Sequence, residues 1–568
     1  MPATTATGKV WKLHPKAPAL QMGKWDIPPV ISQLLYNRGI TTPAQLEAFL
    51  EPARHYPSDP FDLPGIGPAV ERILAAQKRE ENVGIFGDFD VDGIAGTAIV
   101  AQGLQELGLK VFPYIPDRVA EGHGLNTEAL QAMKEMGNTV LITVDCGISS
   151  ASEVAFAQDM GMDVIVTDHH APPAFVEDSP AMAIINPQMA GEPGPFSDLS
   201  GGGLALKLMQ AAHMAMGKEL SPSLYELAAM STVADLVPLR GENRYIVQQG
   251  VARLRNTRRP GLQALFRRAR IRPEAISAET VGFSIAPRLN AAGRLQHASS
   301  SYRLLTTPSL DEAETLADQL EQLNRERQRR TAETWSRAQA FVLEGENVPP
   351  FIVYGDDDVL PGIAGLIAGR LVDRFHRPSL VLSKKDGALR GSARSIPGFN
   401  LARSFDSCGD LLLQHGGHSM AAGLEVSPEK LPALEQRLQR TAEDAIGTQD
   451  LEPCLEIDAE APAATLVGEA YKWLEAMEPF GPTNRTPVFL SRNLEPVHVR
   501  PIGERGQHLK IRLRERGVTW DATAFDLGER WPDGVARIDA AYTLSTEQRG
   551  DTRVVVLKLL DFRPSHQP

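Results

Sequence analysis

The chain has 568 residues, of which 42% are hydrophobic and 23% charged, and this length and composition predict a folded protein of roughly three or four domains. No apolar stretch approaches the roughly 20 residues that span a bilayer, residues 1–18 lack the apolar core of a secretory signal, and three cysteines cannot build a disulfide framework. We therefore expect a cytoplasmic protein without membrane association. The net charge of −13 would normally argue against a nucleic-acid partner, but this average hides strong local asymmetry and decides nothing by itself.

Residues 82–240 alternate short apolar runs with helix-length stretches. Buried strands are predicted at residues 83–86, 140–144, 164–166 and 183–185, with helices at residues 93–107 and 151–160. Strand–helix alternation at this spacing predicts a parallel sheet covered on both faces. In such sheets, ligands bind beyond the carboxyl ends of the strands.

Two arginine clusters follow this region. Residues 253–272 contain eight arginines and no acidic residue, and residues 324–330 contain four arginines. Charge runs of this kind are as often solvated faces as nucleic-acid-binding surfaces, so both interpretations stay open.

The rest of the chain predicts a connector, a second lobe and a β domain. Residues 310–345 form one helical pattern, and its unusual length is typical of a helix that joins two lobes. A strand at 351–354, a helix at 363–375 and a strand at 380–382 repeat the strand–helix unit. After residue 450, strands at 508–513, 536–542 and 554–559 predict a small all-β domain.

Three carboxylates directly follow the first predicted strand, in Gly87-Asp-Phe-Asp-Val-Asp-Gly93. Asp88, Asp90 and Asp92 stand at alternate positions before a glycine that permits a tight turn. Carboxylates crowded at one strand end repel one another unless a cation neutralises them. An EF-hand is excluded, because the twelfth position counted from Asp88 is Ile99 rather than the required glutamate.

The neighbouring predicted strands end with the same chemistry. Asp145 follows one strand, Asp168-His-His170 follows the next, and Asp235 follows a predicted helix. A single aspartate at a strand end is often a helix cap, but three such ends together favour a metal site. Carboxylate and imidazole without thiolate suit Mn²⁺ or Mg²⁺ better than structural zinc. A ligand set this large would hold two ions about 3.5–4 Å apart, which predicts phosphodiester hydrolysis.

These motifs resemble those of the DHH phosphoesterase superfamily. The Asp-x-Asp-x-Asp-Gly turn, Asp145-Cys-Gly147, Asp168-His-His170 and Asp235 match its four core motifs. Residues 116–124 resemble the additional motif of the RecJ branch, the single-stranded-DNA-specific 5′–3′ exonucleases. Residues 389–399 and 416–423 resemble the accompanying DHHA1 domain, and the C-terminal β region resembles the OB-like domain of this branch.

The resemblance implies a role for each residue of the acidic constellation. It implies five metal ligands, namely Asp90, Asp92, Asp145, His169 and Asp235, with Asp145 bridging two Mn²⁺ or Mg²⁺ ions. Asp88, Asp168 and His170 complete the implied catalytic set with Asp145. They would orient the ligands or contact the scissile phosphate.

The resemblance also implies substrate contacts on both lobes. Those of the first lobe are Arg118, Glu121, His123, Arg288 and Asn290. A pocket for a terminal phosphate on the second lobe would comprise Ser392, Arg394, Ser395, Gly416, Gly417 and His418. Planar guanidinium groups suit bidentate phosphate contacts, and glycines let backbone N–H groups approach phosphate oxygens. Lys510, Arg512 and Arg514 would line an OB groove, with simple solvation equally open.

The implied fold is α/β, with two parallel-sheet lobes (DHH and DHHA1) joined by a long helix, plus a C-terminal OB-like β-barrel. The expected boundaries are an N-terminal segment 1–50, a DHH catalytic domain 51–309, a connector helix 310–345, a DHHA1 domain 346–450 and an OB-like domain 451–568. The implied function is two-metal-ion hydrolysis of single-stranded DNA from the 5′ end to mononucleotides, in recombination and repair. Expected partners of this monomer are single-stranded DNA, a single-stranded-DNA-binding protein and a RecQ-type helicase.

Two other functions stay open. A small-substrate DHH phosphoesterase is disfavoured by the OB-like domain, which a tiny substrate would not need. A non-catalytic relative, like the DHH-derived subunit of eukaryotic replisomes, is disfavoured because every core acid and histidine is present. The chain departs from the family pattern at Val359-Leu360, where Trp-His usually precedes Pro-Gly, and within residues 479–489, so no substrate contact is assigned there.

Overall fold

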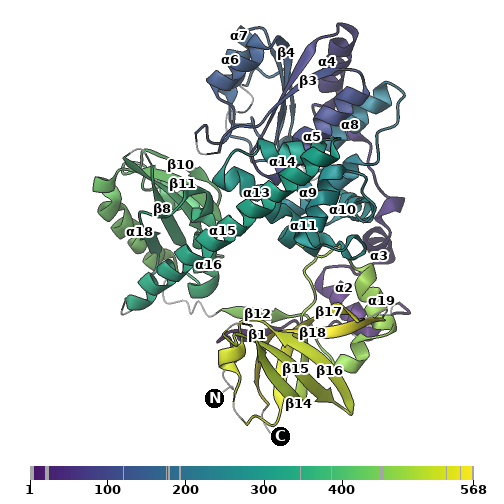
Figure 1. Ribbon diagram of the computed structural model, residues 1–568, viewed down its shortest axis with the longest axis vertical. Helices are drawn as coiled ribbons and strands as arrows, with labels where there is room; N and C mark the ends of the chain where they lie inside the picture. The colour runs from purple at the N-terminus through teal and green to yellow at the C-terminus, as the bar shows by residue number, and fades with distance from the viewer. Residues whose placement is uncertain are drawn as a thin grey trace. The chain divides into compact units, whose positions relative to one another are not determined.

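The computed structural model describes residues 5–18, 25–118, 120–173, 176, 179–190, 194–345, 347–385, 387–446, 453–503, 505–532, 534–549 and 552–565. The chain forms two compact units, one of residues Tyr56–Asp450 and one of Met1–His55 with Leu451–Pro568 (Figure 1). Among the described residues, no helix combines the length and apolar character needed to cross a membrane.

The first lobe of the larger unit is built on a parallel sheet with the strand order β3-β2-β4-β5-β6. Its strands are β2 (Asn82–Gly87), β3 (Lys110–Tyr114), β4 (Asn138–Val144), β5 (Asp163–Thr167) and β6 (Ala183–Ile185). The four predicted strands are confirmed. The edge strand β3 was not predicted, because its residues are mostly half-exposed and it contains Pro113, which a central strand would not tolerate.

Helices cover both faces of this sheet (Figure 1). One face carries α6 (Thr127–Glu135) and α7 (Ala151–Asp159), and the other carries α4 (Ile66–Lys78), α5 (Val91–Glu106) and α8 (Gly201–Ala215). Successive residues of β2 point to opposite faces, so Phe86 packs with Leu130 and Val154 while Ile85 packs with Leu204. Each such side chain contributes about 1.5–3 kcal/mol by its burial. The predicted parallel sheet with two covered faces is confirmed.

A helical region follows the sheet. It comprises α9 (Leu224–Ala234), α10 (Gly241–Leu254), α11 (Pro260–Ala269), α12 (Ala278–Thr280), the π-helical turn η6 (Val281–Ile285), α13 (Ala286–Leu295), α14 (Ser299–Thr306) and α15 (Leu310–Glu344). The long helix α15 confirms the predicted connector, since it packs on α11, α13 and α14 in the first lobe and on α16 in the second.

Many arginines of the two clusters bind acidic groups of the protein itself. On α11, Arg267 pairs with Glu314 of α15, and Arg268 pairs with Asp318. On α15, Arg329 pairs with Glu326 on the same helix. These pairs support the interpretation of much of the clustered charge as part of a helix surface rather than a DNA-binding face.

The second lobe has a sheet in the order β10-β11-β9-β8-β7. Its elements are β7 (Ile352–Gly355), α16 (Pro361–Phe375), β8 (Ser379–Lys385), β9 (Ala388–Arg394), α17 (Leu401–Asp406), β10 (Gln414–Gly417), β11 (Ala421–Val426) and α18 (Leu431–Ile446). The expected parallel pairing joins β7 and β8, whereas the other three neighbouring pairs are antiparallel. Connections of only two or three residues, between β8 and β9 and between β10 and β11, can join antiparallel strands but no parallel ones.

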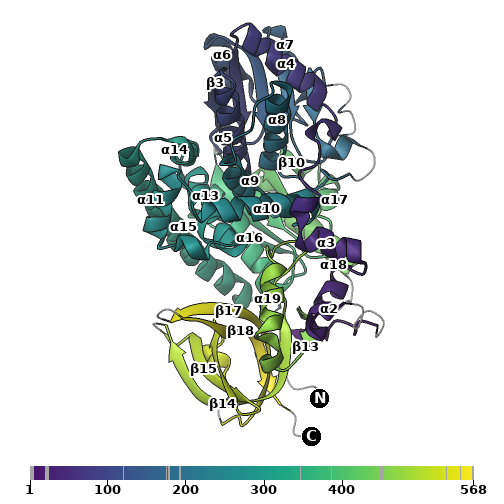
Figure 2. The same cartoon turned by 90° about the vertical axis from the view of Figure 1, so that its right-hand side faces the viewer.

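The smaller unit contains a closed barrel (Figure 2). Its strands are β14 (Phe489–Ile502), β15 (His508–Glu515), β16 (Val518–Ala524), β17 (Ile538–Arg549) and β18 (Thr552–Pro564). The order β14-β15-β16-β18-β17 closes because β14 also pairs with β17. The predicted OB-like barrel is thereby confirmed.

The N-terminal segment packs in the same unit as the barrel. Its elements and their partners are β1 (Val10–Leu13), α2 (Pro29–Asn37), α3 (Pro43–Leu50), β12 (Cys454–Ile457), β13 (Ala459–Glu460) and α19 (Glu469–Ala476). Strand β1 pairs with β12, and Ile31 and Leu34 of α2 share a core with Phe489 and Tyr542. Short 3₁₀ turns lie at Pro52–Arg54, Pro60–Asp62, Pro187–Ala190, Pro273–Ala275, Pro428–Lys430, Ala463–Leu466 and Gly528–Arg530.

Candidate metal centre and phosphate-binding site

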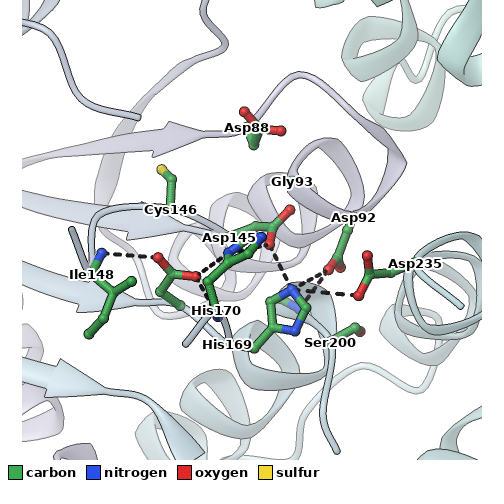
Figure 3. Close-up of polar contacts among 12 residues, drawn as sticks. Asp88, Asp92, Gly93, Asp145, Cys146, Ile148, His169, His170, Ser200 and Asp235 are labelled. Atoms are coloured by element: carbon green, nitrogen blue, oxygen red, sulfur yellow. Dashed lines mark hydrogen bonds and ion pairs between the residues drawn. The ribbon is translucent and has the colours of Figure 1, made fainter. Parts of the chain in front are cut away.

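Three neighbouring strands of the first lobe carry aspartates just beyond their carboxyl ends. The backbone N–H of Asp88 donates to the carbonyl of Val144 at 3.2 Å, and that of Asp145 donates to the carbonyl of Thr167 at 3.0 Å. The N–H of Asp168 donates in the same way to the strand beyond it. Each aspartate therefore continues the hydrogen-bond ladder by one residue, and the side chains of Asp88 and Asp145 lie at the same edge of the sheet (Figure 3).

The ligand atoms of these and nearby residues converge. Within three groups all ligand atoms lie within 4.8 Å of one another, and the groups are Asp88, Asp90 and Asp145; Asp92, His169 and Asp235; and Asp145, His169 and His170. The Nε2 atom of His169 lies 3.1 Å from Asp145 Oδ1, 3.6 Å from Asp92 Oδ2 and 3.5 Å from Asp235 Oδ2. The structure thus brings together all five residues expected to be ligands, with Asp88 and His170 beside them.

Several buried atoms at this site suit a cation. Asp88 Oδ1, Asp145 Oδ1 and His169 Nε2 are buried and have no hydrogen-bond partner among the residues that the structure describes. Buried polar atoms in proteins are nearly always paired, so convergent acceptors of this kind fit a bound ion. Oxygen and imidazole ligands fit Mn²⁺ or Mg²⁺, and the residues present therefore suit these ions.

Without a cation, burial and neighbouring carboxylates raise the pKa of three carboxyl groups, those of Asp90, Asp145 and Asp235. Burial, together with the charges of Asp88 and Asp92, raises the pKa of Asp90 to about 6. Burial and the neighbouring carboxylates raise the pKa of Asp145 well above its usual range. Burial, with Asp92 and Asp90, raises the pKa of Asp235 to about 9. Positive charge at this position would therefore favour the ionised site.

The two adjacent histidines have different environments. His170 Nδ1 lies 2.7 Å from Asp168 Oδ1, which also accepts the His170 backbone N–H at 3.0 Å. This hydrogen bond is the main reason that the pKa of His170 rises to about 9. Burial lowers the pKa of His169 and favours its neutral form, which is the form that ligates metals.

Half-buried arginines lie near the carboxylates, and their charges interact across the two lobes. Arg294 of α13 donates from Nη1 to the carbonyl of Gly362 at 2.9 Å, at the beginning of α16. Burial and the charges of Arg118 and Arg327 lower the pKa of Arg294 to about 9, and Arg394 of β9 acts in the same direction. The charges of Arg118, Arg327 and Arg394 thus all repel Arg294, and a cluster of guanidinium groups near a metal site is favourable for binding a phosphate.

Domain profiles match three parts of the chain. The DHH family, N-terminal domain, matches residues 82–232, the DHHA1 domain matches residues 348–444, and the RecJ OB domain matches residues 457–561. Each profile falls on one of the three architectures described above.

Two relatives, both described as single-stranded-DNA-specific exonuclease RecJ, resemble most of the chain. The protein of Bacillus subtilis (strain 168) is 39% identical over 505 residues, which cover 89% of this chain and 64% of the relative. The protein of Salmonella typhimurium (strain LT2) is 34% identical over 566 residues, which cover 94% of this chain and 95% of the relative. The chain belongs to the RecJ family. It spans slightly less than two thirds of the Bacillus relative and nearly all of the Salmonella one.

Solved RecJ structures share the fold. The crystal structure of RecJ from Thermus thermophilus in complex with Mn²⁺ matches with a TM-score of 0.83 and 28% identity, covering 98% of this chain and 80% of that one. The structure of the same protein with Mg²⁺ matches with a TM-score of 0.76 and 27% identity, covering 98% and 79%. These are the two ions that suit the carboxylate and imidazole groups of this chain.

The loop that resembles the RecJ branch motif lies next to Asp88. His123 Nδ1 is 3.5 Å from Asp88 Oδ1, and the His123 side chain is largely exposed. The guanidinium of Arg118 lies 4.8 Å from the centre of the Phe89 ring. The carboxylate of Glu121 accepts hydrogen bonds from the Tyr114 hydroxyl, the Asp117 backbone and the Asn126 amide, so its described contacts hold the loop together.

The two residues expected on α13 also have protein partners. Arg288 donates from Nε to Glu321 at 2.7 Å, and Asn290 Oδ1 accepts from the backbone N–H of Val91 at 3.1 Å. Asn290 therefore holds the first turn of α5, which carries Asp92. A DNA contact by Arg288 would compete with its ion pair to Glu321.

The expected phosphate pocket lies on β9 and around β10. The hydroxyl of Ser392 accepts from Arg394 Nη1 at 3.3 Å, whereas the buried Ser395 hydroxyl donates to the carbonyl of Phe399 at 2.7 Å. Gly416 and Gly417 lie on β10 and are exposed, as is His418. The ring of His418 is 6.3 Å from that of His170, so this residue of the expected pocket lies near the metal-ligand cluster.

The sequence analysis missed several residues of this site. Arg294 and Arg327 were not singled out, although Arg294 lies four residues after the predicted contact Asn290 and Arg327 lies in the second arginine cluster. The sequence analysis also did not single out the three residues that donate hydrogen bonds to Asp92, namely Gly201, Gly202 and Ser231. The run Gly201-Gly202-Gly203 before an apolar helix was the available signal, since consecutive glycines permit close approach of a backbone.

The barrel of the smaller unit has a groove of its own. The groove has a volume of about 510 Å³ and is lined by Val497, His498, Arg500, Lys510, Ile511, Arg512 and Asp521. Arg512 pairs with Asp521 at 3.2 Å, and Arg514 pairs with Glu495 at 3.4 Å. Of the basic residues lining this groove, Arg500 and Lys510 form no ion pair with any described residue, so they are the groove's available cations.

Proposed function

We propose that this protein hydrolyses single-stranded DNA from its 5′ end, releasing mononucleotides with the help of two divalent cations, in DNA recombination and repair. One observation carries the proposal. Ligand groups that share Asp145 and His169 lie near a cluster of half-buried arginines from both lobes. A metal centre next to a cluster of guanidinium groups is suited to a phosphodiester, which brings negative charge to both.

The chemistry follows from the arrangement of the side chains. Asp145 belongs to two ligand groups, so we propose that it bridges the two ions. Bound divalent ions activate water and neutralise charge on the phosphoryl oxygens. Asp168 lies 2.7 Å from Nδ1 of His170 and favours the protonated imidazole, whose Nε2–H would then donate to a phosphate oxygen. Asp88 and His123 would orient the strand that enters beside them.

The proposed polarity depends on a second phosphate site. Arg394 and Ser392 on β9, with Gly416, Gly417 and His418, would hold the 5′-terminal phosphate. A terminal phosphate anchored at a fixed distance from the metal ligands would allow cleavage of the first nucleotides only. Arg118 and Arg294 would neutralise the phosphates between the two sites.

The first experiment is digestion of a single strand labelled separately at each end, with Mn²⁺ or with EDTA. We expect the 5′-labelled strand to yield labelled mononucleotide at once and the 3′-labelled strand to shorten gradually. EDTA should abolish both reactions, and a blunt duplex should resist. Mononucleotide appearing first from the 3′ label would overturn the polarity. Activity limited to oligomers of a few nucleotides would instead favour a small-substrate phosphoesterase.

We expect Arg394→Gln to remove the preference for a 5′-phosphorylated end. The variant loses charge-assisted hydrogen bonds worth about 1.5–3 kcal/mol, so hydrolysis of a 5′-phosphorylated strand should slow roughly 10- to 100-fold. A strand with a 5′-hydroxyl lacks the group that Arg394 would bind, and its rate should change much less. The rates of the two substrates, compared for the variant and the wild-type protein, check this prediction.

The matched control is Arg390→Gln, on the same strand. Arg390 pairs with Glu425 at 3.1 Å, so it already has a protein partner. This variant should keep the wild-type preference. An equal loss on both substrates in Arg394→Gln would contradict a terminal-phosphate pocket and indicate a general defect.

We further propose that the protein acts as a cytoplasmic monomer with a single-stranded-DNA-binding protein and a RecQ-type helicase. An enzyme that accepts only unpaired strands needs an activity that separates duplex ends. Such a helicase should make a blunt duplex degradable in the assay above.

A further inference from the structure

The side chain of Asp92 is buried at the beginning of α8. Its Oδ2 accepts a hydrogen bond from the backbone N–H of Gly201 at 2.8 Å, and its Oδ1 accepts one from Gly202 at 2.7 Å. Oδ1 also accepts a hydrogen bond from the hydroxyl of Ser231 on α9. Asp92 is only 1% exposed, so these donors rather than water determine its orientation.

We infer that Ser231 is a positioning residue, which turns the carboxylate of Asp92 so that Oδ2 faces the ion held with His169 and Asp235. The inference rests on the metal centre of the proposed function but not on its substrate. The described contacts of the Ser231 hydroxyl are with Asp92 and Ser200. Its action would therefore pass through Asp92.

A count of acceptor positions supports this orientation. An ionised carboxylate offers about four lone-pair positions, two on each oxygen. Gly202 and Ser231 occupy both positions of Oδ1, and Gly201 occupies one of Oδ2. The remaining position is on Oδ2, the oxygen that lies 3.6 Å from His169 Nε2. Asp92 can therefore ligate an ion through one oxygen only, in a direction that the protein determines.

A chain of hydrogen bonds favours donation by the Ser231 hydroxyl to Asp92. The Ser200 hydroxyl lies 2.7 Å from the Ser231 hydroxyl, and Ser200 Oγ accepts the backbone N–H of Gly203 at 3.2 Å. When Ser231 donates to Asp92, its oxygen can accept from Ser200. The first three N–H groups of α8 thus converge on Asp92, two directly and the third through the two hydroxyls. The positive end of the α8 dipole favours the negative charge that a cation requires.

The close approach of α8 to Asp92 and Ser231 requires glycine at the first two positions of α8, Gly201 and Gly202. A Cβ atom at Gly202 would lie 2.3 Å from Ser231 Oγ, and a Cβ at Gly201 would lie 2.6 Å from Asp145 Cβ. Side chains at these positions would push α8 away from both carboxylates. The two glycines therefore permit the contact between α8, α9 and the metal ligands.

The next residue on α9, Thr232, makes the usual hydrogen bond of a hydroxyl within a helix, whereas Ser231 does not. Thr232 donates its hydroxyl to the carbonyl of Ala228 at 2.7 Å, which is the usual contact of a buried hydroxyl within a helix. Ser231 has the analogous carbonyl four residues earlier on its own helix. Its hydroxyl instead contacts a carboxylate that is 139 residues distant in the sequence. The Ser231 hydroxyl therefore acts on Asp92 rather than on the backbone of its own helix.

The test measures Mn²⁺ binding without DNA. Metal-free wild-type protein and Ser231→Ala are titrated with Mn²⁺, and electron paramagnetic resonance reports the free ion. Loss of an orienting partner of a metal ligand typically weakens binding about 10- to 100-fold. We expect one Mn²⁺ equilibrium of Ser231→Ala to weaken by at least about tenfold, with the other less affected. Ser200→Ala, which removes only the support of Ser231, should change the same equilibrium in the same direction by a smaller factor.

The matched control is Ser301→Ala. Ser301 is equally buried, and its hydroxyl donates to the backbone carbonyl of Leu289 at 2.7 Å rather than to a carboxylate. This variant should bind Mn²⁺ like the wild-type protein. If Ser231→Ala lowers only the unfolding midpoint of the metal-free protein and keeps wild-type Mn²⁺ affinity, the inference is overturned. Weakened Mn²⁺ binding in a protein that proves inactive on DNA would support the inference while refuting the proposed substrate.

Discussion

Replacement of Asp145 by asparagine should reduce DNA hydrolysis by more than about 100-fold, because even partners that merely orient a metal ligand typically contribute 10- to 100-fold. Asp145 contributes to two of the three ligand groups, and an amide oxygen carries no charge to hold a divalent ion. The initial rate of mononucleotide release from a 5′-labelled single strand, at saturating Mn²⁺, measures the loss.

The same substitution should stabilise the metal-free protein. Burial and the neighbouring carboxylates raise the pKa of Asp145 well above its usual range, so its ionised form opposes folding near neutral pH. Asparagine has nearly the same shape and no charge. We expect a higher unfolding midpoint for Asp145→Asn than for wild-type protein in EDTA, and a lower one when Mn²⁺ is present.

A matched control uses an aspartate at the opposite end of a neighbouring strand. Asp163 begins β5 and pairs with Arg72, so Asp163→Asn removes a carboxylate of the same sheet outside the site. It should leave DNA hydrolysis unchanged and lower the unfolding midpoint with or without Mn²⁺. If Asp145→Asn retained a tenth of the wild-type rate or more, Asp145 would not be a ligand shared by the two ions.

Removal of divalent cations should make the protein progressively less stable between pH 7 and pH 9. The pKa of Asp235 is raised to about 9, so the folded state holds a proton that the unfolded state has already lost. The pKa of His170 is also raised to about 9, chiefly by Asp168, and its proton is likewise absent from the unfolded chain above about pH 6.5. Both groups stabilise the fold at lower pH and lose that contribution as the pH rises through 9. Asp235 contributes a slope of about 1.4 kcal/mol per pH unit, and the half-exposed His170 contributes less because solvent screens its charge.

Urea unfolding in EDTA at several pH values between 7 and 9 measures this slope. Asp235→Asn should reduce the slope by the contribution of Asp235, about 1.4 kcal/mol per pH unit. Saturating Mn²⁺ should flatten it, because a bound cation replaces the proton at the carboxylates. A slope of zero in EDTA, or one equal with and without Mn²⁺, would contradict a crowded site that needs a cation.

Much of the metal site could be predicted from the sequence because its residues follow elements with a clear local pattern. Apolar runs of strand length predicted β2, β4 and β5, and the carboxyl ends of parallel strands meet at one edge of a sheet. Asp88, Asp145 and Asp168 therefore had to lie close together once the strands were assigned. The long helix α15 was equally evident, since its periodicity extends over 35 residues.

Pairing between distant segments was not predictable in this way. The connection of two residues between β8 and β9 allowed only an antiparallel pair, yet the apolar pattern of either strand alone fits both directions. Nothing near Val10 indicates that β1 pairs with β12, more than 400 residues later. Such contacts depend on the packing of whole elements and leave no period in the sequence.

The sequence by itself determined the chemistry of this protein, namely which carboxylates and histidines stand at the ends of parallel strands. Only the tertiary structure decided how that chemistry is oriented. It brings the beginning of α8 and Ser231 of α9 onto Asp92, and it gathers Arg118, Arg294, Arg327 and Arg394 from both lobes. The physical reason is that strand and helix patterns are local, whereas hydrogen bonds and charge repulsion depend on distance in space. Residues a hundred positions apart become neighbours only after the sheet, the helices and the second lobe have packed.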